Sequence, residues 1–181
     1  MTEPAQILDF WFADGMQNQW FRAPPALDAR IRARFESTWE AAARGEFSGW
    51  LQSPDGALAL AIVLDQFPLN MYRGQPQAFA TERQAIAISH DAIDRGHDRR
   101  LPHERVAFLY MPLMHSEEID DQTLAVRLFE RAGLSSNLRF ARHHRDLIRR
   151  FGRFPHRNAI LGRPSTPEEL AYLASDEAFR G

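Results

Sequence analysis

Apolar residues in this chain recur at intervals of three and four, and this spacing constrains the fold more than any other feature of the sequence. Such spacing places the apolar side chains on one face of an α-helix. The alternation typical of a half-buried strand never persists, and no Asn-Gly or Asp-Gly hairpin lies between two β-branched runs. The segment 55–67 is apolar on every side, which predicts a helix enclosed by other helices. The sequence therefore predicts an all-α fold.

Turn and capping residues divide the pattern into a series of predicted helices. Glycines end several of them, and Pro68 ends the third. Pro112 lies inside the fifth as a predicted kink, and Thr166 forms a capping box with Glu169 before the last. Short connections favour antiparallel neighbours, so we predict stacked antiparallel helical hairpins. The predicted helices begin at Thr2, cover 27–44, 55–67 and 78–95, begin again near Pro102, cover 120–132 and 136–151, and finish with one that begins at Pro167.

Length and composition favour a single domain in the cytoplasm. The 181 residues contain no linker or change of composition, so we predict one domain over residues 1–181. The absence of cysteine excludes disulfides, thiolate metal sites and cysteine nucleophiles. The first residues lack the features of a signal peptide, and the longest apolar run, 57–64, is far shorter than the roughly 20 residues that a bilayer requires. We therefore expect a cytoplasmic protein with no membrane partner.

The charges of the chain limit its chemistry. The net charge of −2 gives no general attraction for nucleic acid. All 22 basic residues are arginine, which binds carboxylates and phosphates well but cannot act as a base or form a Schiff base, so lysine-dependent catalysis is excluded. Between Arg139 and Arg163 there are eight arginines and one acid, Asp146. This local excess is expected to attract an anion.

Four polar segments interrupt apolar stretches, where burial costs free energy unless polar groups find partners. The first segment, 64–74, contains Asp65, Gln66 and Arg73, and its first two polar residues end a helix that has no solvent face. Either Asp65 pairs with an arginine and Gln66 fixes the turn at Pro68, or these side chains line a site.

The other three segments contain histidines. His115 points toward the apolar face of its helix at a turn weakened by proline, and His144 lies at the centre of the apolar face of the 136–151 helix. His156 lies in the loop 152–163, whose alternating cations and apolar anchors indicate a loop pinned to the scaffold. His115 is either a core histidine with satisfied hydrogen bonds or a ligand-binding or acid–base group.

The sequence of these segments resembles a known family. The resemblance is carried by LDQFP at 64–68, YRG at 72–74, YMPLMHSE at 110–117, HR at 144–145, RFGRFPHRN at 150–158, LGR at 161–163 and ST at 165–166. These motifs are similar to those of the bacterial Domain of Unknown Function 924 family and cover nearly the whole chain. The resemblance implies an all-α fold similar to tetratricopeptide superhelices, and it implies no activity. Leu69 departs from the basic residue expected there, which weakens any claim that a cation at that position binds ligand.

The favoured function is a groove lined by histidine and arginine that binds a small acidic molecule, a carboxylate or a phosphate. Histidine titrates near neutrality, so the candidates for acid–base catalysis are His115, His144 and His156. The residues predicted to bind the ligand are Asp65, Gln66, Arg73, Glu117, Arg150, Arg153, Arg157 and Asn158. No motif fixes a nucleophile, so the sequence leaves open whether the protein is an enzyme and assigns no cofactor.

The main alternative is a tetratricopeptide-like module that binds an acidic peptide or protein partner on a concave surface. Nucleic acid is not favoured, because the arginines of the 136–151 helix lie opposite its apolar face and are simply explained by solvation. A metal site is not predicted either. The His-x-Glu at 115–117 and the adjacent His143 and His144 supply ligand types without the required spacing.

Overall fold

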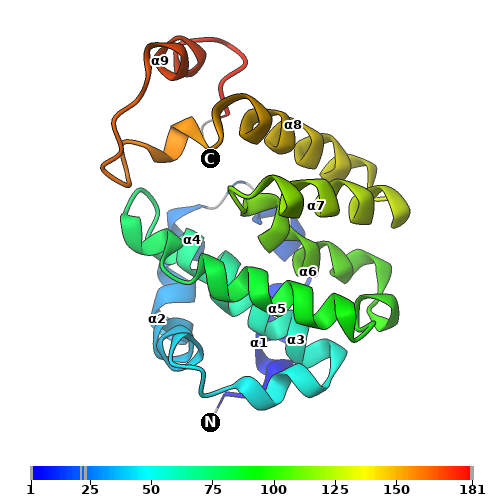
Figure 1. Ribbon diagram of the computed structural model, residues 1–181. Coiled ribbons are helices and arrows are strands. Elements are labelled where there is room, and N and C mark those ends of the chain that lie inside the picture. Colours follow the sequence, from blue (N-terminus) through cyan, green and yellow to red (C-terminus); the bar gives the residue numbers. More distant parts are fainter. Residues whose placement is uncertain (1, 21, 23, 180–181) are drawn as a thin grey trace. The chain divides into compact units, whose positions relative to one another are not determined.

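The computed structural model describes residues 2–20, 22 and 24–179 (Figure 1). All regular secondary structure in these residues is helical, which confirms the predicted all-α fold. The chain divides into two compact units, Met1–Arg73 with Gln77–Pro112 and Gly74–Pro76 with Leu113–Gly181. A single domain over residues 1–181 stays a prediction, as does the tetratricopeptide-like arrangement. Among the described residues, no helix is both long enough and apolar enough to cross a bilayer.

The first unit is built around a buried helix. Its helices are α1 (Pro4–Trp11), α2 (Pro25–Ala43), α3 (Pro54–Ala61), α4 (Phe67–Met71), α5 (Glu82–Asp94) and the first ten residues of α6 (His103–His115). Helix α3 packs against α1 and α5, while α2 packs against α4. Every residue of α3 from Gly56 to Ala61 is buried, which confirms the enclosed helix predicted from its uniformly apolar sequence.

Aromatic rings fill the core of this unit. Trp11 is fully buried and meets Phe67 and Phe108 edge to face, with ring centroids 5.8 and 5.5 Å apart. Phe35 stacks on Phe67 at 5.0 Å. Such geometry adds to the stabilisation that burial of the rings supplies. The apolar spacing read from the sequence therefore brings α1, α2, α4 and α6 onto one aromatic core.

The prediction that Pro68 ends the third helix was wrong. The chain stays helical through Met71, by way of a π-helical turn, η3 (Ile62–Gln66), in which the N–H of Phe67 donates to the carbonyl of Ile62. Proline has no N–H to donate to the carbonyl four residues earlier, that of Leu64. The hydroxyl of Thr81 donates to this carbonyl instead, at 2.6 Å. A bond from a distant residue thus replaces the one that proline removes.

The second unit contains a helical hairpin. Helices α7 (Ile119–Arg131) and α8 (Ser135–Phe151) pack along each other and are joined by a short connection, as predicted (Figure 1). Gly152 ends α8 in the left-handed region with φ of 70°, a conformation that glycine adopts without steric cost. A short helix η6 (Pro155–Arg157) and α9 (Pro167–Leu173) follow, and they pack against each other.

Three helix starts differ from the predictions by two residues or more, and the capped start of α9 is confirmed. Helix α2 begins at Pro25 rather than at Leu27. Helix α1 begins at Pro4 because Glu3 and Gln6 form a capping box there, whereas Thr2 donates or accepts a hydrogen bond with Thr38 at 2.9 Å. Helix α5 begins at Glu82 rather than 78, after a separate turn at Pro76–Phe79. The capping box of Thr166 and Glu169 at the start of α9 is present as predicted.

Candidate functional site

The predicted site residues lie in both compact units. The first unit contains Asp65, Gln66 and Arg73. The second unit contains His115, Glu117, His144, Arg150, Arg153, His156, Arg157 and Asn158.

The first set forms a chain of hydrogen bonds along one side of η3 and α4. Gln66 donates to the carboxylate of Asp65 at 2.6 Å, and the amide of Asn70 donates to the backbone carbonyl of Gln66 at 2.8 Å. Arg73 in turn donates to the side chain of Asn70 and to both carboxylate oxygens of Asp28, at 3.1 and 3.2 Å. Asp65, Gln66 and Asn70 are buried. These contacts explain the polar residues of the first set as parts of the structure around the proline turn.

In the second unit, long side chains cap the C-terminal end of α6. The last carbonyls of a helix have no partner within it. Gln122 donates to the carbonyls of Met114 and Ser116 at 2.7 and 2.6 Å. His144 bonds to the same Met114 carbonyl through Nδ1 at 3.2 Å, and Arg157 donates to the carbonyl of His115 at 2.9 Å. The inward-facing polar residues of α7, α8 and η6 thus have a structural role.

The same residues bring four histidines together, and we call His115, His143, His144 and His156 the histidine cluster. The rings of His143 and His144 have centroids 6.3 Å apart. The ring of Phe154 contacts those of both His144 and His156, with centroids 5.2 and 5.6 Å apart. The structure therefore places the three predicted catalytic histidines in one region of the second unit.

Burial keeps two of these histidines neutral. The pKa of His144 is lowered to about 3, mainly by burial and to a lesser degree by the nearby His115, His143 and His156, while the bond to Met114 opposes the change. Burial also lowers the pKa of His156 to about 4, helped by the charge of Arg157, while Glu117 opposes the change. At neutral pH both rings are therefore uncharged, and each offers one nitrogen lone pair.

One ring nitrogen of His144 and one of His156 lack a hydrogen-bond partner among the described residues. Because a carbonyl can only accept, the bond to Met114 places the proton of His144 on Nδ1 and leaves Nε2 as an acceptor. Within the described part of the chain, the buried His144 Nε2 and His156 Nδ1 have no hydrogen-bond partner. Leaving a buried polar atom unsatisfied costs about 1–3 kcal/mol, so such atoms are uncommon in native structures.

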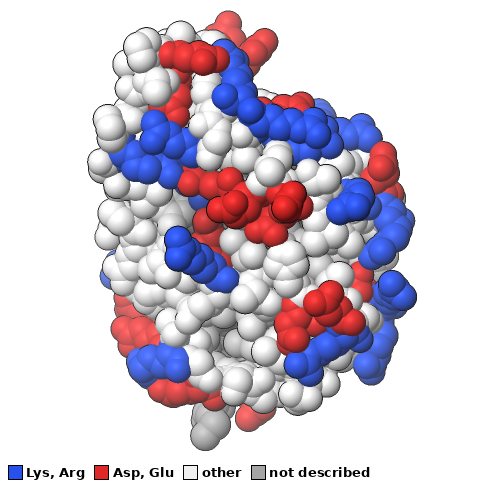
Figure 2. Space-filling view, in the orientation of Figure 1, with Lys and Arg blue, Asp and Glu red and all other residues white. Residues whose placement is uncertain are grey.

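The arginines of the loop after α8 are paired within the unit. Arg153 binds both carboxylate oxygens of Glu169 at 2.7 and 2.8 Å, and Arg150 binds Glu168 at 2.8 Å. The Arg153 bond is the main reason why the pKa of Glu169 is lowered to about 2, against the opposing effect of burial. Figure 2 shows blue and red side chains side by side on this part of the surface. The cation excess read from residues 139–163 alone is offset by acids from elsewhere in the sequence.

Asn158 holds the loop to the start of α9. Its amide donates to Glu169 at 3.2 Å and to the hydroxyl of Ser165 at 3.1 Å, while its carbonyl oxygen accepts from Arg163 at 3.0 Å. Asn158 is 1% exposed. The sequence predicted Asn158 as a ligand-binding residue, whereas in the described structure its side chain bonds to the protein groups of Arg163, Ser165 and Glu169.

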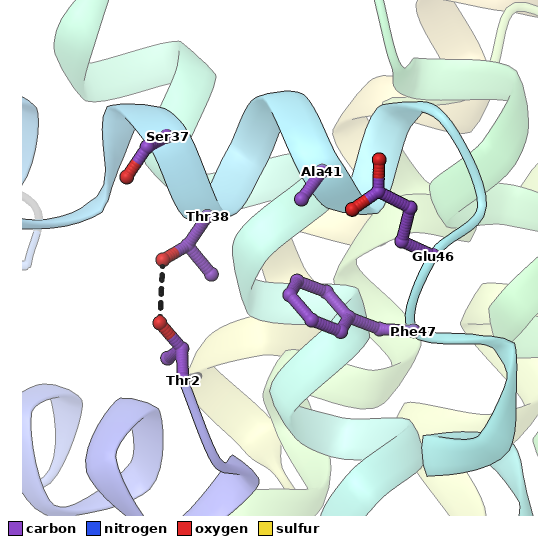
Figure 3. Close-up of a pocket in the computed structure, with 6 residues that line it drawn as sticks. All are labelled: Thr2, Ser37, Thr38, Ala41, Glu46 and Phe47. Atoms are coloured by element: carbon purple, nitrogen blue, oxygen red, sulfur yellow. Dashed lines mark hydrogen bonds between the residues drawn. The ribbon is translucent and has the colours of Figure 1, made fainter.

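Two hollows on the surface are poor sites for an anion. One, of about 300 Å³ in the first unit, is lined by Thr2, Ser37, Thr38, Ala41, Glu46 and Phe47 and offers an acid but no cation (Figure 3). The other, of about 410 Å³ in the second unit, is lined by Arg150 and Arg153 together with their partners Glu168 and Glu169. Its charges cancel. Within residues 2–20, 22 and 24–179, no three histidine or acidic side chains are placed to hold a metal ion.

Comparison with known proteins identifies the family. The chain matches the model of a bacterial protein of unknown function, DUF924, over residues 7–177. It belongs to the DUF924 family. A solved structure of a protein of unknown function from Agrobacterium tumefaciens is similar to this DUF924 chain, with 43% identity and a TM-score of 0.90 over 94% of this chain and 96% of the other. No curated protein matches. The DUF924 membership confirms the resemblance in the sequence and brings no assigned activity with it.

Proposed function

We propose that this DUF924 protein binds a small acidic molecule, bearing a carboxylate or phosphate group, at the histidine cluster of the second unit. The observation that carries the proposal is the pair of buried ring nitrogens, His144 Nε2 and His156 Nδ1, without partners. A ligand that satisfies them would recover the free energy lost by their burial. Titratable groups with strongly shifted pKa values also concentrate at functional sites.

The charge of Arg157 acts on His156 more strongly than the opposite charge of Glu117, and this favours an acid over a cation. Arg157 is 5% exposed, lies beside the cluster and lowers the pKa of His156 through its charge. A carboxylate or phosphate placed there would offset that charge and raise the pKa of the histidines. They would then take up protons and donate hydrogen bonds to the anion, so binding would strengthen as the pH falls. The same shift would bring the histidines closer to the range useful for acid–base catalysis.

Only some of the residues predicted to bind the ligand would contact it at the histidine cluster. His144, His156 and Arg157 would contact the ligand, with His115 near them. Residues such as Arg153 and Asn158 would hold the loop that presents His156, because they bond to Glu169. We also propose that the protein acts in the cytoplasm, as its cysteine-free sequence favours.

An acidic peptide is the second candidate ligand. Helix α8 presents half-exposed arginines, Arg142 and Arg149, whose exposed fractions are 52% and 55%. They are engaged with Glu130 and Asp146 in exposed ion pairs, and such pairs contribute little to stability and exchange readily. A peptide carrying several acids could replace these partners.

The test is a titration of the purified protein with acetate, inorganic phosphate, citrate and an oligoglutamate peptide, followed by the NMR signals of the histidine rings. Small acids should shift the signals of His144 and His156 and bind more tightly at pH 6 than at pH 8. His156→Gln should weaken this binding, and the double variant Arg142→Gln/Arg149→Gln should leave it unchanged. Binding of the peptide alone, lost in the double variant, would support the second candidate. If no acid moves the histidine signals, the proposal is wrong.

A further inference from the structure

The end of the described chain lies against the histidine cluster. The ring of Phe179 has its centroid 4.6 Å from that of His144 and 5.0 Å from that of His156, and both contacts are edge to face, at 70° and 76°. It also lies 6.3 Å from the ring of His143. A flat apolar ring from the protein itself therefore covers the two histidines that have unpaired nitrogens.

Tyr172 bonds to the segment that carries this ring. The hydroxyl of Tyr172 accepts from the N–H of Phe179 at 2.8 Å and donates to the carbonyl of Glu177 at 3.4 Å. Phe179 is partly exposed and packs with Ala178 on a small core that contains Ile148 and Phe154. For the ring to leave, the two hydrogen bonds of Tyr172 and the ring contacts with His144 and His156 have to break.

We infer that the ligand of the histidine cluster is an acid with an aromatic or similarly flat apolar group, and that this group takes the place that the Phe179 ring holds here. The inference rests on the proposed function and names the chemical class of its ligand. In this arrangement Phe179 acts as a competitor built into the chain, and binding requires its displacement.

The surroundings of the ring suit such a ligand. Phe154 and the edges of two neutral imidazoles offer aromatic contacts, which favour the edge-to-face geometry seen with Phe179. The guanidinium of Arg157 lies 4.6 Å from the centroid of the Phe154 ring, so a cation adjoins the same apolar surface. An acid whose ring replaces Phe179 would thus have a cation beside the same apolar surface.

The test compares two kinds of acid on matched variants. Acetate and inorganic phosphate carry no ring, while benzoate and phenylacetate do. Phe179→Ala should bind the two aromatic acids about tenfold more tightly than the wild type, since a competitor that occupies most molecules weakens apparent affinity by that factor. Tyr172→Phe, which removes the anchoring hydroxyl without touching the histidines, should change the affinity in the same direction.

The control is Phe151→Ala, which removes another ring that packs on the same small core. The ring centroid of Phe151 lies 5.3 Å from that of Tyr172. This variant should lower stability as Phe179→Ala does and leave the affinity for aromatic acids unchanged. If acetate and phosphate bind but the aromatic acids gain nothing in Phe179→Ala, the proposed function stands and this inference is wrong. If no acid binds to any variant, both fail.

Discussion

The guanidinium of Arg163 binds the carboxylate of Glu117 with two parallel hydrogen bonds, Nη1 to Oε2 at 2.7 Å and Nη2 to Oε1 at 2.9 Å. The N–H of Phe154 donates to the same carboxylate at 2.8 Å, and Arg163 donates to the carbonyl of Phe154 at 3.2 Å. These bonds tie both ends of the loop 152–163 to Glu117, two residues after the end of α6. They hold His156 in the histidine cluster without contacting it.

Breaking this pair should destabilise the second unit. Arg163→Met should lower the free energy of unfolding by about 1–3 kcal/mol, because a charged group that is only a quarter exposed loses its partner. Denaturant unfolding measures the change. Arg142→Met, which breaks the exposed pair with Glu130, serves as the control and should cost less than about 1 kcal/mol. Equal effects of the two variants would contradict the role given to Glu117.

The Glu117 pair should also be sensitive to acid. Burial raises the pKa of Glu117, but the bonds from Arg163 and Phe154 and the nearby positive charges outweigh it, so the pKa is lowered. A carboxyl with a lowered pKa stabilises the fold above its ordinary pKa of about 4.5 and loses this contribution as the pH falls through the folded value. Glu117→Gln should therefore lower stability at pH 7 and have less effect near pH 3. A constant difference across this range would contradict the prediction.

The fold should be less stable in mild acid than at neutral pH because of His144. Its folded pKa of about 3 lies below the ordinary 6.5, so unfolding takes up a proton between these values and stability falls as the pH falls. Between pH 7 and pH 5 the expected loss is about 2 kcal/mol from this residue. His144→Gln keeps a donor for Met114 and removes the titration, so its unfolding free energy should change less over that range. Parallel pH profiles for the variant and the wild type would rule this out.

Thr81 should be important for the π-helical turn. Its hydroxyl donates to the Leu64 carbonyl and accepts from the indole N–H of Trp39 at 3.0 Å, and all these groups are buried. Thr81→Val keeps the shape but leaves the carbonyl and the N–H unpaired, so unfolding should become easier by about 1–3 kcal/mol. Thr81→Ser, which keeps the hydroxyl, is the control. Thermal unfolding gives the melting temperature of each variant, and equal values for Thr81→Val and Thr81→Ser would contradict the prediction.

Removal of the cap of α9 should have a smaller effect on the free energy of unfolding. Thr166 accepts from the N–H of Glu169 at 3.2 Å, and Glu169 accepts from the N–H of Thr166 at 2.7 Å. Thr166→Ala should lower the unfolding free energy by about 1 kcal/mol, whereas Thr166→Ser should be close to neutral. Chemical denaturation gives the values. A loss in Thr166→Ser as large as in Thr166→Ala would show that the methyl group, not the hydroxyl, stabilises the helix.

The helices could be read from the sequence because their signals are local. The period of apolar residues, the glycine after α8 and the capping box at Thr166 act within a few residues of where they stand. The enclosed helix α3 was predicted for the same reason, since a segment without a polar face can only be buried. Pro68 misled the prediction because its missing bond is replaced by Thr81, and nothing near Pro68 in the sequence reveals that partner.

The candidate site depended on contacts between distant residues. Polar residues in apolar stretches drew attention to His115, His144 and His156, which lie in the second unit. Their partners were beyond the reach of a local pattern, because a hydrogen bond or an ion pair joins whatever residues the packing of helices brings together. Glu117 and Glu169 neutralise arginines that looked free to bind an anion, and Phe179, in a stretch with no motif, covers the cluster. The period of the apolar residues and the capping residues were thus enough to predict the helices. The partners of the charged side chains and of the aromatic rings are decided only by how the helices pack.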